Sequence, residues 1–146
     1  MSDHQNRGTP TRSFWIISAA ALAWNLMGIA SYLMTVTMSP ETLNALPEAE
    51  RALYAGVPTW VTSSYAIAVF GGTLACVLLL ARKTWAVPGF VVSLAAILAQ
   101  MGHAFFMTPM IEVRGATSAL LPLSIIAVAI YLVWFSRSAR AKSWLS

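Results

Sequence analysis

The chain has 146 residues, of which 58% are hydrophobic and only 10% are charged. A soluble domain carries about a quarter charged residues. This composition, with a mean hydropathy of +0.70, therefore excludes an ordinary soluble domain. It also excludes intrinsic disorder, which requires low hydrophobicity and high charge. The net charge of +4 does not indicate nucleic-acid binding, because the basic residues lie at the ends of apolar segments, as membrane topology demands.

Four apolar segments follow a polar stretch, residues 1–13, that we expect to be a disordered cytoplasmic tail. None of the four contains Asp, Glu, Lys or Arg. Each is long enough to cross a bilayer core, which needs about 20 helical residues, and in lipid the backbone must satisfy its own hydrogen bonds. The sequence therefore predicts an all-α integral membrane bundle over residues 14–136, with helices at about 14–36, 58–81, 85–106 and 116–135.

The connections differ in character. Residues 37–57 form the long loop, and its Ser39-Pro40-Glu41 start is typical of a helix N-terminus. A second start at Pro47 and a terminator at Gly56 predict another short helix. We expect both to lie on the outer membrane surface. Residues 137–146 are expected to form a basic cytoplasmic tail.

The orientation follows from the nine Lys and Arg residues. Seven fall on one side if both termini are cytoplasmic, and two, Arg51 and Arg114, fall on the other. The positive-inside rule therefore predicts cytoplasmic termini. Ala21-Leu22-Ala23 resembles a signal-peptide cleavage site, but the apolar run continues to Val36, which favours an uncleaved membrane anchor.

Polar residues inside the first and third segments are the candidate ligand contacts. Asn25 and Tyr32 share one helix face, and Gln100 and His103 share another. An amide at mid-membrane depth must find partners, so Asn25 either makes an interhelical hydrogen bond or contacts a ligand. His103 either makes a structural hydrogen bond or serves a ligand or gate. We expect these four residues to converge on one outward-opening pocket, with Trp60 at its rim.

The second segment carries a ridge of small residues. Such ridges let helices approach closely, so we expect helix packing here rather than chemistry. A single cysteine excludes an intrachain disulfide, and one membrane histidine does not make a metal or haem site. We expect no cofactor and no metal. The ridge comprises Ser64, Ala68, Gly71, Gly72 and Cys76.

Three motifs carry a resemblance. They are Trp24-Asn25-x-x-Gly28-x-x-x-Tyr32-Leu33-Met34-Thr35, Gly56-x-Pro58-x-Trp60 with Ala66–Gly72, and Arg82-Lys83-x-Trp85-Ala86-Val87-Pro88 with Ser93-Leu94. Over residues 14–107 the chain resembles small bacterial four-helix membrane proteins labelled as sugar transporters or uncharacterised. The resemblance implies a multi-pass protein of the bacterial inner membrane. Its label implies transport, and it assigns no catalytic residue.

Two functions remain open. The polar lining favours transport or binding of a small uncharged polar molecule, with a homo-oligomer needed for any pore. The small-residue ridge favours a non-catalytic accessory subunit of a larger membrane complex. An enzyme is not expected, because the sequence shows no nucleophile–base pair, paired carboxylates or phosphate loop.

Overall fold

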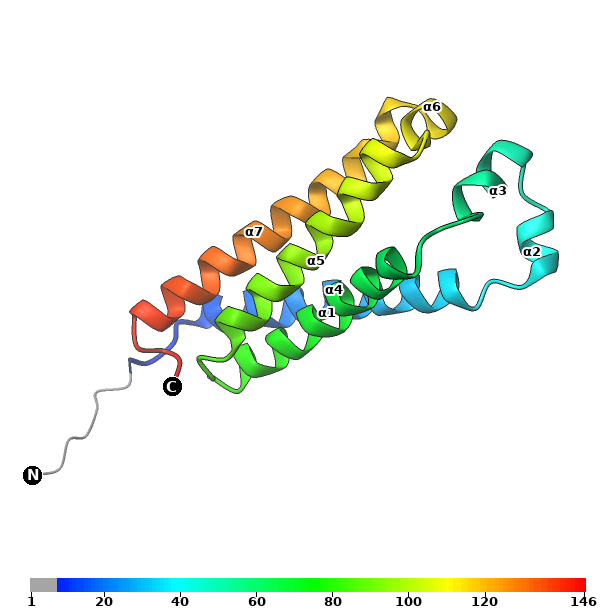
Figure 1. Cartoon of the computed structure of the whole chain (residues 1–146). Helices are drawn as coiled ribbons and strands as arrows, with labels where there is room; N and C mark the ends of the chain where they lie inside the picture. The colour runs from blue at the N-terminus through cyan, green and yellow to red at the C-terminus, as the bar shows by residue number, and fades with distance from the viewer. Residues whose placement is uncertain (1–7) are drawn as a thin grey trace, which may run out of the picture.

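The computed structural model describes residues 8–146 and is an all-α bundle (Figure 1). Four helices are long and apolar enough to cross a membrane, so the expected fold class is confirmed. No strand occurs among the described residues. The elements are α1 (Arg12–Val36), α2 (Pro40–Asn44), α3 (Glu48–Tyr54), α4 (Thr59–Leu80), α5 (Ala86–Met107), α6 (Met110–Arg114), a 3-10 turn η1 (Ala116–Ala119) and α7 (Leu120–Ala141).

The long helices pack in chain order. α1 lies on α4, α4 on α5, and α5 on α7. The beginning of α1 and the end of α7 also meet, where the rings of Phe14 and Phe135 stack with centroids 5.9 Å apart. We call this end of the bundle the terminal end, and the opposite end, which carries α2, α3 and α6, the loop end (Figure 1).

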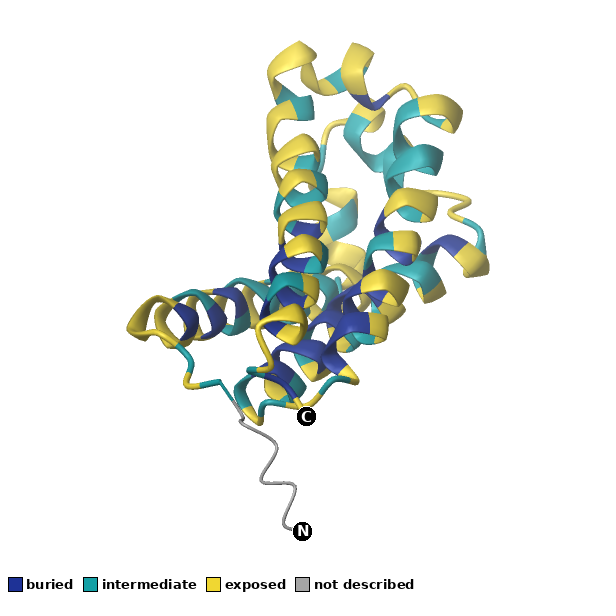
Figure 2. Ribbon diagram, turned by 90° about the vertical axis from the view of Figure 1, so that its left-hand side faces the viewer, coloured by how far each residue is buried: buried dark blue, intermediate teal, exposed yellow. Residues whose placement is uncertain are grey.

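The buried core lies mainly toward the terminal end. Phe14, Cys76, Leu79 and Ala86 are fully buried there. A smaller cluster, formed by Ala68, Ala96, Ile97 and Ala129, continues toward the loop end. Figure 2 shows the buried residues gathered in the half that carries the C-terminus, with exposed residues dominating the far end. Buried residues are therefore concentrated toward the terminal end, and the loop end is mostly exposed.

The expected basic tail 137–146 is mostly not a tail. α7 continues to Ala141, because Ser136 and Ala139 are buried against the bundle and extend the helix beyond the last apolar run. The chain then folds back, and Leu145 is buried in the core cluster. At the other terminus, Arg12 and Ser13 already belong to α1. The expected disorder of residues 1–7 lies outside the described part of the chain.

Two helices end in the same way without glycine. After α4, Arg82 has φ +59°, its N–H donates to Leu79 O, and the N–H of Lys83 donates to Leu78 O. Ser143, with φ +58°, repeats this pattern after α7. These are Schellman motifs, whose left-handed position is usually glycine. Non-glycine residues in this conformation cost about 1–3 kcal/mol, so the surrounding contacts must hold them there.

Arg82 makes such contacts. Its Nε donates to Trp144 O at 2.7 Å, and its Nη2 donates to Gly8 O at 2.9 Å. The N–H of Ser146 donates to Arg82 O at 2.7 Å. One arginine thus joins the α4–α5 turn to the segments that precede α1 and follow α7.

Candidate functional site

Asn25 lies in the contact between α1 and α4. Its Nδ2 donates to Ala21 O at 2.9 Å and to Cys76 Sγ at 3.4 Å. Its Oδ1 lies directly over Gly72, in the space that a Cβ would occupy. The amide therefore fills a notch in α4. Of the two roles considered for Asn25, an interhelical hydrogen bond and a ligand contact, this arrangement matches the first.

Tyr32 lies seven residues, or about two helical turns, closer to the loop end on the same helix face. Its ring meets the rings of Tyr65 and Phe70 edge-on, with centroids 5.2 Å and 5.8 Å away. Both partners belong to α4. The face of α1 that carries Asn25 and Tyr32 is thus turned toward α4.

Trp60 and His103 meet at the loop end of α4 and α5. Their rings contact edge to face, with centroids 5.6 Å apart and planes at 90°. Gln100 precedes His103 by three residues and is partly buried. Within residues 8–146 its side chain makes no hydrogen bond to protein. Gln100 and His103 therefore share one face of α5, and His103 brings that face against Trp60 of α4.

The five predicted ligand residues do not form one pocket between the first and third membrane helices. Asn25 reaches α4 at Gly72, whereas His103 reaches it at Trp60. Those positions are 12 residues apart, which is about 18 Å along a helix. The expectation fails because α1 and α5 both turn their polar faces toward α4 instead of toward each other.

The small-residue ridge divides between two surroundings. Ala68, Gly72 and Cys76 are buried, and Ser93 Oγ of α5 donates to Ala68 O at 2.7 Å. A Cβ on Gly71 would meet nothing within 4 Å. The buried members bring α1, α4 and α5 together, while Gly71 faces away from the bundle.

Ser64, the first ridge residue, is less buried. Its Oγ donates to Trp60 O at 2.8 Å within the same helix. It therefore contributes a small surface near the loop end and no hydrogen bond to another helix.

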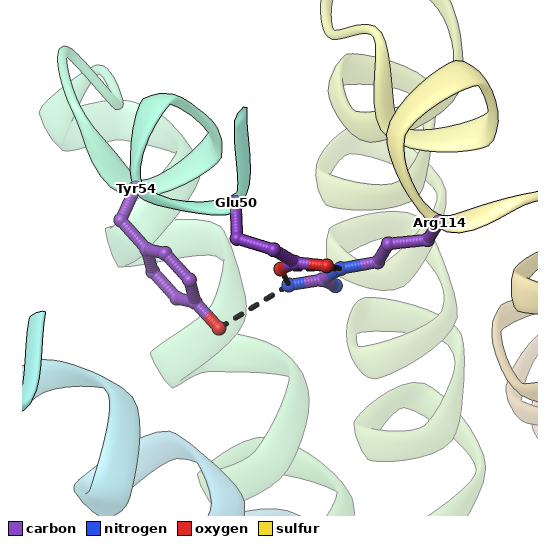
Figure 3. A network of polar contacts seen from close by, with 3 residues as sticks. All are labelled: Glu50, Tyr54 and Arg114. Carbon is purple, nitrogen blue, oxygen red and sulfur yellow. Dashed lines mark hydrogen bonds and ion pairs between the residues drawn. The ribbon is translucent and has the colours of Figure 1, made fainter. Parts of the chain in front are cut away.

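A polar network joins the two loops of the loop end (Figure 3). The Arg114 guanidinium donates from Nε and Nη2 to the Glu50 carboxylate at 2.9–3.2 Å, and Nη2 also reaches the Tyr54 hydroxyl at 3.3 Å. The hydrogen bond from Arg114 lowers the pKa of Glu50, and the bond from Glu50 raises the pKa of Arg114. We call these three residues the loop clasp.

The loop clasp was not expected from the sequence. Opposite charges in the two loops at the same end of the predicted bundle were the only available signal, and the two residues are 64 positions apart. The clasp ties α3 to α6, so it holds the α1–α4 pair and the α5–α7 pair together where the membrane core is loosest. Because the arginine and the glutamate are paired with each other and solvent-accessible, we interpret them as a structural ion pair rather than a catalytic pair.

A regular stripe of exposed residues runs along the side of α1 that faces away from α4. Its members are spaced four, three, four, three and four residues apart, and they comprise three small alanines, two flexible methionines and an isoleucine. The stripe lies two positions, or about 200°, around the helix from Asn25 and Tyr32. We call it the α1 stripe; it consists of Ile16, Ala20, Ala23, Met27, Ala30 and Met34.

The cavities described in the structure lie at the terminal end, not near the predicted ligand residues. The larger, about 740 Å³, lies along α7 beside α5, and the smaller, about 170 Å³, lies between the start of α1 and the end of α7. Among residues 8–146, no group of three or more His, Cys, Asp or Glu side chains is placed to hold a metal ion.

Comparison of the chain with protein-family models, curated proteins and solved structures gives no match.

Proposed function

We propose that this protein is a non-catalytic subunit that packs laterally against another membrane protein through the α1 stripe. The exposed stripe itself carries the proposal. Heptad-like spacing brings one side of a helix against a partner helix along its whole length. Alanines at such positions allow the backbones to approach closely, which drives association in lipid.

The coverage of α1 supports this assignment. Only Phe14, Ser18 and Ala21 of its 25 residues are buried, and all three lie in its first half. Asn25 and Tyr32 of α1 already contact α4, and the opposite face, which carries the stripe, contacts no other helix of the described chain. The filled notch at Asn25 also removes one half of the lining on which a transport function would depend.

A variant in the middle of the stripe tests the proposal. Ala23→Trp should displace the partner helix, while the protein itself stays folded because position 23 is exposed. Leu74→Trp is the matched control, since Leu74 is 60% exposed on α4 and lies at a similar depth, about 20 Å from the loop end of its helix. Each variant is purified in mild detergent, and co-purifying polypeptides are quantified.

We expect the wild type and Leu74→Trp to retain a stoichiometric polypeptide that Ala23→Trp loses, with equal thermal stability for all three. A wild type that purifies alone would contradict the proposal. So would a partner that Ala23→Trp retains. A self-dimer disrupted by Ala23→Trp would assign the stripe to homo-oligomerisation instead.

A second candidate, binding of a small uncharged polar molecule at the loop end, is favoured by Gln100. Its amide has no protein hydrogen-bond partner in the described chain, and it lies one turn from the Trp60–His103 contact. An amide one helical turn from an aromatic pair suits a neutral hydroxyl-rich ligand. The resemblance to proteins labelled as sugar transporters agrees with this candidate. A location of the protein in a bacterial inner membrane would agree with it as well.

Calorimetric titration of the purified protein with a neutral monosaccharide tests this candidate. Gln100→Leu should abolish binding without lowering abundance, whereas Ala99→Leu, on an exposed neighbouring position, should leave binding unchanged. Loss of abundance in Gln100→Leu would assign the residue to folding.

A further inference from the structure

The larger cavity at the terminal end is a groove between α5 and α7. Leu94 of α5 forms one wall, and Ile130, Val133 and Trp134 of α7 form the other. The groove follows α7 from Ile130 to Ala141, a distance of about 16 Å at the rise of a helix. Its inner part, between Leu94 and Ile130–Trp134, is apolar, and its outer part, from Arg137 to Ala141, is mostly polar.

The mouth of the groove is basic. Arg137, Ser138 and Arg140 line the end that lies beyond the apolar span. Both arginines are exposed, and they lie three residues apart, so their side chains share one side of the helix. Within residues 8–146, all four glutamates belong to α2, α3 and α6 at the loop end, so no acidic side chain of the described chain lies near this mouth.

The apolar part of the groove lies within one membrane leaflet. From Arg137 to Ile130 it measures about 10 Å along α7, and one leaflet of a bilayer core about 30 Å thick contributes about 15 Å. Trp134, 62% exposed, lies one turn from the arginines, where tryptophan anchors a helix at the membrane interface. The charged mouth thus lies at headgroup level, and the apolar walls extend into the acyl-chain region of that leaflet.

We propose that this groove is a binding site for one anionic phospholipid. The phosphate is held by Arg137 and Arg140, with the Ser138 hydroxyl beside them, and one acyl chain lies against Leu94, Ile130 and Val133. Two guanidinium groups without an acidic partner among residues 8–146 select a negative headgroup, because arginine binds phosphate oxygens through parallel hydrogen bonds. The apolar walls require a chain attached to that phosphate, which commits the site to a lipid rather than to a free phosphate. Basic pockets between helices on one side of a membrane recognise such headgroups.

The site is independent of the α1 stripe, which lies on the other edge of the packing order. Its occupant would also serve the fold, since it would fill a gap between α5 and α7 that no side chain of the chain fills. Loss of the lipid would therefore leave partner binding by α1 intact.

Native mass spectrometry of the full chain in a non-ionic detergent tests the proposal, because a neutral micelle has no charged surface to attract lipid unspecifically. Phosphatidylglycerol is titrated as the anionic probe and phosphatidylcholine as the zwitterionic one. We expect one phosphatidylglycerol to bind at least about tenfold more tightly than phosphatidylcholine. The double variant Arg137→Gln/Arg140→Gln should lose this preference, since each arginine contributes roughly 1 kcal/mol toward an anionic lipid and two together exceed a tenfold change.

The matched control is Arg12→Gln/Lys83→Gln. It removes the same charge from the same end of the bundle, at two exposed positions that do not line the groove. Equal losses of phosphatidylglycerol binding in both double variants would show attraction by bulk charge and overturn the site. Gel filtration should give the same profile for all forms.

Two further measurements address the acyl chain. Glycerol 3-phosphate, which has the headgroup phosphate without the chain, should not displace the bound lipid at equal concentration. Val133→Trp should weaken phosphatidylglycerol binding by filling the groove, even with both arginines present. Displacement by glycerol 3-phosphate would reduce the site to a phosphate site, and unchanged binding in Val133→Trp would refute the placement of the chain.

Discussion

The notch at Gly72 offers a sharp test of the packing, because Gly71 beside it provides its own control. Gly72→Ala adds a Cβ that falls on Asn25 Oδ1 and lies 3.1 Å from Ser93 Oγ. Neither neighbour has free space, since each belongs to a different helix packed on α4. The Asn25 amide must therefore rotate or the helices must separate.

The change in the free energy of unfolding caused by Gly72→Ala has three contributions. Overpacking a core typically costs about 1–3 kcal/mol. Disturbing the interhelical hydrogen bonds of Asn25 costs roughly a further 0.6–2 kcal/mol. Replacing glycine by alanine in a helix returns about 1 kcal/mol through helix propensity. The net loss of stability for Gly72→Ala is thus about 0.6–4 kcal/mol, whereas Gly71→Ala, which meets open space, should gain up to about 1 kcal/mol.

Reversible unfolding in mixed micelles, followed by circular dichroism, measures both variants. Adding Asn25→Ala should rescue part of the loss in Gly72→Ala, because the side chain that causes the clash is then absent. The two substitutions should accordingly be non-additive in a double-mutant cycle. Equal stability of Gly72→Ala and Gly71→Ala, or strict additivity with Asn25→Ala, would refute the packing of Asn25 into the notch.

The loop clasp should loosen in acid, because Arg114 lowers the pKa of Glu50 in the folded protein. The stability that the ion pair adds is therefore present above the ordinary pKa of a glutamate, and it is lost as the pH falls through the lowered pKa of Glu50. Hydrogen exchange in α6 should increase over that range, and Glu50→Gln should abolish the pH dependence; an unchanged profile in Glu50→Gln would contradict this role. Ser143→Gly should stabilise the protein by relieving the left-handed backbone, whereas Arg82→Gly should not, because it also removes two hydrogen bonds; unfolding in micelles ranks the two, and the opposite order would contradict the reasoning. Reporter fusions at Ser146 should give a cytoplasmic signal and fusions after Glu48 an external one, with an external signal from Ser146 excluding cytoplasmic termini.

Hydropathy predicted the four membrane helices because lipid leaves an apolar segment few alternatives to a helix. It did not predict where they end. α7 runs beyond Phe135 into a polar sequence because Ala139 is buried by neighbours, and α1 starts at Arg12 because its first turn packs toward the end of the chain. The positions at which these helices begin and end depend on tertiary contacts, which a hydropathy profile does not describe.

The candidate site shows the same limit. Spacing placed Asn25 with Tyr32, and Gln100 with His103, because positions along one helix are fixed by its geometry. Which helix each face meets depends on the packing order, in which α4 lies between α1 and α5. The pairing of Glu50 with Arg114 also depends on two loops brought together by four spans. Local periodicity predicts faces, and only the fold predicts their partners.

The contacts of Arg82 have a consequence for the order in which the bundle assembles. α4 and α5 are joined by a short turn and share the most extensive packing in the molecule, so they should pair first, as local contacts do. The Arg82 guanidinium lies in the turn of this hairpin. In the complete bundle it donates to the carbonyl of Gly8, 74 residues earlier, and to the carbonyl of Trp144, 62 residues later. α1 and α7 can reach those positions only after each has docked separately. The arginine therefore acts late, and its loss should accelerate the separation of the outer helices while leaving formation of the central hairpin at its original rate.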